Sequence, residues 1–138
     1  MRILGIDYGD VRVGLAMSDA LGITAQGLET INYKEDKSIL FKRLKEIIDE
    51  YKVNTIVVGM PINMNGTSSK RVEVTKEFIE LLKEKYKNIK IETIDERLTT
   101  VQAHNTMNAL NINKKKKKNL VDTISAVYIL ETYMSRII

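Results

Sequence analysis

The chain has 138 residues, of which 43% are hydrophobic and 29% charged, a balance typical of one globular domain with its own core. It has no cysteine, which excludes disulfides and thiolate metal sites. Lysine and arginine number 22 against 18 aspartates and glutamates, and this net charge of +4 weakly favours an anionic partner. The sequence shows neither a signal peptide nor a membrane span, so we expect one cytoplasmic domain over residues 1–138 with no membrane contact.

The first segment predicts a strand, a tight turn and a second strand. An apolar run over residues 3–6 ends at Asp7, and residues 8–10 have the composition of a turn. Residues 11–18 alternate apolar and polar or small side chains, which is the period of a strand. A third strand is expected over residues 28–32. Because the links are short, these three strands should form an antiparallel meander.

The rest of the chain alternates helices and strands. The pattern predicts a helix over 40–51, a strand over 55–59, a loop over 60–66, a helix with its apolar stripe over 75–86, a strand over 90–95, a short helix over 100–110, a polar loop over 111–119 and a last helix over 120–137. Helical crossovers make the first, fourth and fifth strands parallel. The expected fold is therefore α/β, a mixed five-stranded sheet of three antiparallel strands and then two parallel ones, flanked by helices.

Four carboxylates are expected at one edge of the parallel strands. Asp7 ends the first strand, Asp95 and Glu96 end the fifth, and Asp122 is expected in the first turn of the last helix. Clustered carboxylates repel one another unless a cation lies between them, and oxygen ligands suit Mg²⁺ or Mn²⁺. Two such ions about 4 Å apart could clamp a phosphodiester.

Each acid also has a simpler explanation. Asp7 could only open a turn, Glu96 could form a surface ion pair with Arg97, and Asp122 could only stabilise the helix dipole.

Four motifs occur in order along the chain. They are D-Y-G-D-V-R-V-G at 7–14, G-M-P-I-N-M-N-G at 59–66, D-E-R-L-T-T at 95–100 and D-x-x-S-A at 122–126. Together they resemble the YqgF/RuvX family of the RNase H-like superfamily over nearly the whole chain, with Ser125 replacing an expected alanine. The resemblance implies an RNase H-like fold and a nuclease that depends on Mg²⁺ or Mn²⁺. It implies that Asp7, Glu96 and Asp122 are both the catalytic and the metal-binding residues.

The resemblance also implies a function and a partner. The expected function is hydrolysis of phosphodiester bonds in maturing the 5′ end of pre-16S ribosomal RNA, in the cytoplasm. An older family label, Holliday junction resolvase, makes branched DNA the alternative substrate. A nucleic-acid-binding module of ribosome assembly or transcription with little catalytic activity is a third reading. Sequence pattern does not choose between RNA and DNA, nor between a monomer and a homodimer.

Cationic side chains near these acids are candidates for holding the phosphates of a substrate. The predicted substrate-binding residues are Arg12, Arg97, Lys114, Lys115, Lys116, Lys117 and Lys118. The lysines could instead be a solvated loop, Arg12 a solvent-facing strand residue and Arg97 the partner of Asp95.

Two further side chains have alternative readings. Tyr8 could stack on a base or pack in the core. His104 is interpreted as a surface residue rather than a catalyst.

Overall fold

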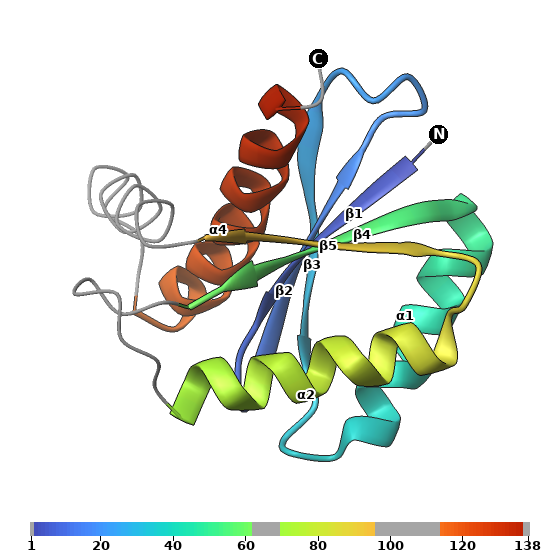
Figure 1. Ribbon diagram of the computed structural model, residues 1–138. Coiled ribbons are helices and arrows are strands. Elements are labelled where there is room, and N and C mark those ends of the chain that lie inside the picture. Colours follow the sequence, from blue (N-terminus) through green and yellow to red (C-terminus); the bar gives the residue numbers. More distant parts are fainter. Residues whose placement is uncertain (1, 62–69, 96–113, 137–138) are drawn as a thin grey trace.

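The computed structural model describes residues 2–61, 70–95 and 114–136, and of 114–120 only the backbone (Figure 1). Its elements in chain order are β1 Arg2–Tyr8, β2 Arg12–Ser18, β3 Ala25–Asn32, α1 Lys37–Tyr51, β4 Val53–Met60, α2 Lys70–Lys85, β5 Lys90–Asp95 and α4 Lys114–Arg136. The helix predicted over 100–110 and most of the loop predicted over 60–66 lie outside the described residues.

The five strands form one sheet in the order β3-β2-β1-β4-β5. β1, β2 and β3 pair antiparallel, whereas β4 pairs parallel with β1 and β5 pairs parallel with β4. The predicted mixed sheet is therefore confirmed, with strand β3 beginning three residues earlier than expected. No described helix is long and apolar enough to cross a membrane.

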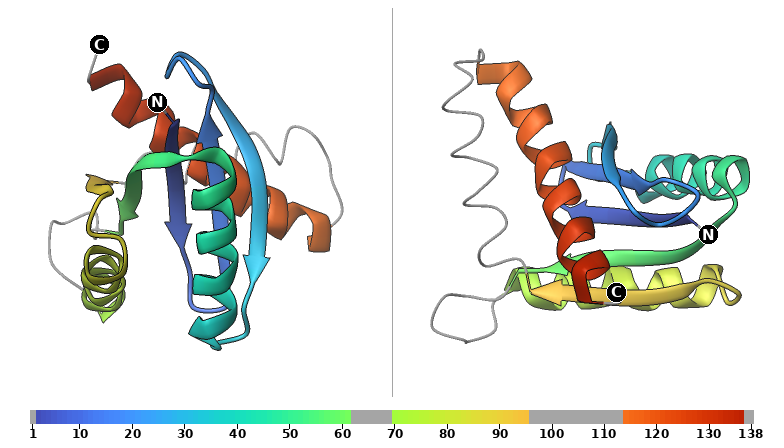
Figure 2. Two further views of the ribbon diagram at one scale, coloured as in Figure 1. Left: turned by 90° about the vertical axis from the view of Figure 1, so that its right-hand side faces the viewer. Right: turned by 90° about the horizontal axis from the view of Figure 1, so that it is seen from above.

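The helices divide between the two faces of this sheet (Figure 2). Leu4, Ile6 and Tyr8 of β1 pack in one core with the buried stripes of α1 and α2. Ile3 packs in a second core with α4 on the opposite face. Because side chains alternate along a strand, Asp7 shares the α4 face with Ile3.

The stripes predicted for the two helices on the first face are confirmed. α1 buries Leu40, Leu44, Ile47 and Ile48, and α2 buries Val72, Thr75, Phe78, Ile79 and Leu82. Tyr8 joins them in the core with only 4% of its surface exposed. Its ring stacks on Phe78 with centroids 4.0 Å apart and planes 6° from parallel. Of its two readings, packing is the one the structure supports.

Helix α4 lies unusually close to the sheet where it crosses glycines. A Cβ on Gly14 would collide with the backbone carbonyl of Asp122, and a Cβ on Gly5 would lie 2.9 Å from the carbonyl oxygen of Ala126. Only a residue without a side chain permits this approach. The glycines of β1 and β2 therefore set where Asp122 lies.

The predicted loop over 111–119 is wrong from Lys114 onward. Helix α4 begins at Lys114, so the five lysines belong to its first turns. Lysine is a good helix former, and residues 114–121 contain no glycine or proline to stop a helix. Asp122 consequently lies roughly two turns inside α4 rather than in its first turn. Helix-dipole stabilisation no longer explains this acid, because the effect falls off within one turn.

Candidate active site

Asp7 and Asp122 come together across Gly14. Asp7 is the register partner of Gly14 in the antiparallel β1–β2 ladder, and register partners present their side chains to the same face. Gly14 in turn lies against the backbone of Asp122. Two acids that are far apart in sequence thus occupy one face at the carboxyl end of β1. Ligands of α/β sheets commonly bind at such strand ends.

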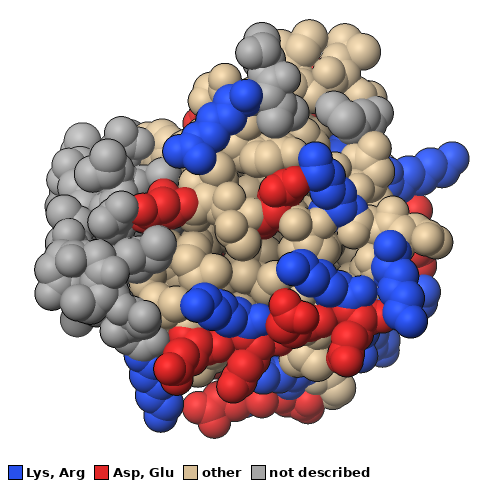
Figure 3. All heavy atoms as spheres, viewed as in Figure 1, with Lys and Arg blue, Asp and Glu red and all other residues tan. Residues whose placement is uncertain are grey.

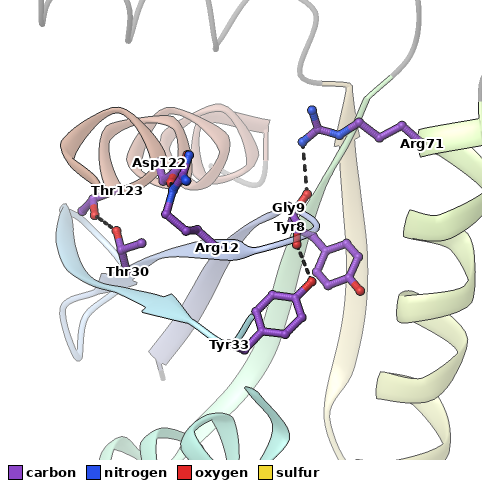
Figure 4. Close-up of polar contacts among 8 residues, drawn as sticks. All are labelled: Tyr8, Gly9, Arg12, Thr30, Tyr33, Arg71, Asp122 and Thr123. Atoms are coloured by element: carbon purple, nitrogen blue, oxygen red, sulfur yellow. Dashed lines mark hydrogen bonds and ion pairs between the residues drawn. The ribbon is translucent and has the colours of Figure 1, made fainter. Parts of the chain in front are cut away.

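Arg12 also lies on this face, and it binds Asp122 (Figure 4). Its Nε donates to Oδ2 of Asp122 at 2.8 Å, and the two side chains are 32% and 20% exposed. Arg12 is therefore not a free, solvent-facing strand residue. The carboxylate of Asp122 already holds a cation, and partial burial strengthens such a pair relative to a fully exposed one.

The turn that joins β1 to β2 is held from both sides by Tyr33. The Tyr33 hydroxyl donates to the carbonyl oxygen of Gly9 at 2.5 Å, and its backbone N–H donates to the carbonyl of Val11 at 3.0 Å. Burial raises the pKa of Tyr33, so the hydroxyl keeps its proton and remains a donor. This clamp fixes the backbone between Asp7 and Arg12.

A hollow of about 270 Å³ opens beside the turn. It is lined by Gly9, Asp10, Val11, Arg12, Arg71 and Asp122. Arg71 stands near the start of α2, and its Nη2 donates to the carbonyl oxygen of Tyr8 at 3.2 Å. Sequence reasoning missed Arg71. The available signal was topological: a helix that follows a parallel strand begins at the edge where that strand ends, and β4 ends at the edge of Asp7.

Asp95 lies on the other face of the sheet. Its neighbour Ile94 packs with α4, and its register partner Met60 packs against the core of α1 and α2. Asp95 is thus directed away from the face of Asp7 and Asp122.

Several predicted site residues are not described by the structure. Glu96 and Arg97 lie outside the described residues, as do the side chains of Lys114 to Lys118. His104, interpreted above as a surface residue, also lies outside them. Within the described ranges, no three histidine, aspartate or glutamate side chains gather closely enough to hold a metal ion. The described part of the site therefore supplies two acids.

Comparison with known proteins identifies the family. A model of the RuvX family, described as Holliday junction resolvase, matches residues 1–136. A protein of Acetivibrio thermocellus named "Putative pre-16S rRNA nuclease" is 54% identical over 97% of this chain and 95% of its own length. One of the same name from Ruminiclostridium cellulolyticum is 56% identical over 99% of this chain and 96% of its own length.

Solved structures of low sequence identity share the fold. The fowlpox virus resolvase in complex with Holliday junction DNA has a TM-score of 0.66 at 12% identity, covering 100% of this chain and 99% of that one. RuvC of T. thermophilus with a Holliday junction substrate has a TM-score of 0.60 at 15% identity, covering 99% and 96%. The chain has the RNase H-like fold of these resolvases, and it belongs to the RuvX family.

Proposed function

We propose that this chain is a nuclease that hydrolyses phosphodiester bonds in pre-16S ribosomal RNA, using a divalent cation held by Asp7, Glu96 and Asp122. The observation that carries the proposal is the meeting of Asp7 and Asp122 on one face across Gly14. Neither a turn-opening role for Asp7 nor a dipole role for Asp122 requires that juxtaposition.

The residues present fit a hard divalent cation. Both described acids offer carboxylate oxygens, which suit Mg²⁺ or Mn²⁺. The position is suited to positive charge, because Asp122 already binds the guanidinium of Arg12. When bound, such an ion activates water for attack and stabilises the charge of the leaving oxygen.

Asp95 is not proposed as the third acid, because it lies on the α2 face, away from Asp7 and Asp122. Glu96, which lies outside the described residues, is proposed as the third acid from the family resemblance. Asp7 is anchored by a strand and Asp122 by a helix, which holds these two ligands on rigid elements.

The substrate is proposed from the name of the two similar proteins, "Putative pre-16S rRNA nuclease". Arg12, Arg97 and the lysines 114–118 are proposed to hold its phosphates. The lysine run begins the helix that carries Asp122, so phosphate contacts there would be coupled to the position of that acid.

The test is cleavage by the purified protein in Mg²⁺ or Mn²⁺, with a pre-16S rRNA leader and a four-way DNA junction as parallel substrates. We expect the RNA to be cut, EDTA to stop the reaction, and Asp7→Asn and Asp122→Asn to abolish it. Asp49→Asn is the matched control, because this exposed acid of α1 pairs with Lys45 in a surface contact of 3.5 Å. Cleavage of RNA by Asp7→Asn at the wild-type rate would overturn the assignment. Cleavage of the junction alone would make the chain a resolvase.

A further inference from the structure

The hollow beside Asp122 brings together residues from three elements that the sequence keeps far apart. The β1–β2 turn contributes Asp10 and Arg12, α2 contributes Arg71, and α4 contributes Asp122. Among the described side chains, two arginines and two aspartates line it, and Asp122 is paired with Arg12. A metal ion on Asp122 would make this set more positive and strengthen the attraction for an anion that Arg71 already provides.

Helix α2 carries charges of both signs. In the view of Figure 3, acidic and basic side chains interleave along the exposed face of α2. Because the face seen there is not of one sign, the individual cations beside the hollow matter for phosphate binding.

Arg71 is placed where it can bind an anion in the hollow. Its guanidinium borders the hollow, and one bond to the carbonyl of Tyr8 fixes its direction (Figure 4). Arginine has five N–H donors in a planar fork, and this bond uses one of them. The fork matches the geometry of phosphate oxygens, which can accept two parallel hydrogen bonds.

Arg12 is the second cation, and its present partner is one of the proposed metal ligands. The pair joins Nε to Oδ2 of Asp122 at 2.8 Å. A divalent ion on the same carboxylate would repel the guanidinium and compete for its oxygens. The Arg12 guanidinium, released from Asp122, could then bind another anion. The hollow that Arg12 lines is where a phosphate could approach it.

We propose that this hollow binds a backbone phosphate of the nucleic acid, with Arg71 as its fixed cation and Arg12 as a cation that exchanges Asp122 for the phosphate when a metal ion binds. The proposal rests on the proposed function in that it takes Asp122 as a metal ligand. Phosphate binding by Arg71 is measurable without any cleavage, so the two can fail separately.

The first measurement is binding of a short fluorescent single-stranded RNA in EDTA, followed by anisotropy over a range of salt. Arg71→Gln should weaken binding about tenfold, the loss of a hydrogen bond between charged groups. The slope of log affinity against log salt should fall by about 0.7, because one phosphate contact is lost. Lys83→Gln is the control, since Lys83 lies toward the other end of α2 and pairs with Glu80. If Arg71→Gln and Lys83→Gln both keep the wild-type affinity and slope, the hollow is not a phosphate site.

The second measurement is calorimetric titration with Mn²⁺ in the absence of nucleic acid. Arg12→Gln should bind Mn²⁺ more tightly than wild type, by about threefold, because the competing guanidinium is gone. Arg71→Gln should bind Mn²⁺ as wild type does, because Arg71 contacts a carbonyl rather than an acid. An unchanged or weaker Mn²⁺ affinity of Arg12→Gln would overturn the exchange.

The two arms separate this inference from the proposed function. If the wild type cuts neither substrate and yet Arg71→Gln loses RNA affinity, the nuclease assignment fails and the phosphate site stands. If the wild type cuts RNA and Arg71→Gln binds it normally, the phosphate site alone is wrong.

Discussion

The two faces of the sheet differ in the side chains that the same strands present to the helices. The face covered by α1 and α2 is filled with bulky side chains such as Leu4, Tyr8 and Phe78. The face covered by α4 carries Gly5 and Gly14 where the helix crosses, and charged groups where β1 ends. Side-chain volume on the first face supports stability, whereas the lack of side chains at Gly5 and Gly14 on the second face lets α4 bring Asp122 close to Asp7. Substitutions on the two faces should therefore affect different measurements.

The largest stability effect is expected on the first face. Phe78→Ala removes a fully buried ring that stacks on Tyr8, and we expect it to lower the free energy of unfolding by about 3 to 5 kcal/mol in urea denaturation. Ile39→Ala is the control, because Ile39 is 49% exposed on α1 and its truncation should change stability little. Equal losses from the two variants would contradict the assignment of this face as the main core.

At its glycines, the second face should respond to added volume. Gly14→Ala places a Cβ against the backbone of Asp122, and backbone has little freedom to move aside. We expect a loss of about 1 to 3 kcal/mol, accompanied by a fall in cleavage as Asp122 is displaced. Gly27→Ala is the matched variant, because the nearest atoms to its Cβ would belong to side chains rather than backbone, the methyl of Thr123 first among them. It should lose less stability and keep cleavage.

A smaller effect should come from the clamp by which Tyr33 holds the β1–β2 turn. Tyr33→Phe deletes the hydroxyl that donates to Gly9 at 2.5 Å, and thermal or urea unfolding should show a loss of about 1 kcal/mol. Tyr86→Phe should lose less, because its hydroxyl lies 3.5 Å from the carbonyl of Phe41. If Tyr86→Phe proves the more damaging, the turn after β1 is not held by Tyr33.

The smallest effect is expected at the start of α1, remote from the α4 face. Asp36 caps this helix by accepting from the backbone N–H and the hydroxyl of Ser38, and these bonds hold its pKa below the ordinary value of 3.8. The cap therefore stabilises the folded chain at neutral pH, and this contribution is lost as the pH falls through the lowered pKa. Asp36→Ala should lower the urea midpoint at pH 7 with cleavage unchanged. The difference in urea midpoint between Asp36→Ala and wild type should narrow below pH 3.8. A difference that stays constant with pH would contradict the capping role.

Much of the fold was predictable because it follows from local periodicity. The alternation over residues 11–18 and the apolar runs at 3–6 and 55–59 identified strands that the structure confirms. The secondary structure of the lysine run was harder to predict, because like charges and polarity suggest a loop while lysine itself favours a helix. The lysines are helical in the structure, and the rest of the same helix, α4, packs against the sheet.

The site was predictable only in part, because its geometry depends on long-range contacts. Sequence placed Asp7 at a strand end, yet only the register with Gly14 shows that Asp122 meets it. Alternation alone could not say which face Asp95 occupies until Ile94 was assigned to the α4 face. Arg71 belongs to no pattern near these acids and became visible only when α2 was placed beside the turn.

The central claim is that Asp7 and Asp122 form one metal site on the α4 face. The most direct test is a crystal structure of the protein grown with Mn²⁺, with the ion located by its anomalous scattering. We predict a manganese peak bound by carboxylate oxygens of Asp7 and Asp122, with the Arg12 guanidinium moved off Asp122. A fully occupied manganese ion elsewhere, with Arg12 still bound to Asp122, would contradict the account.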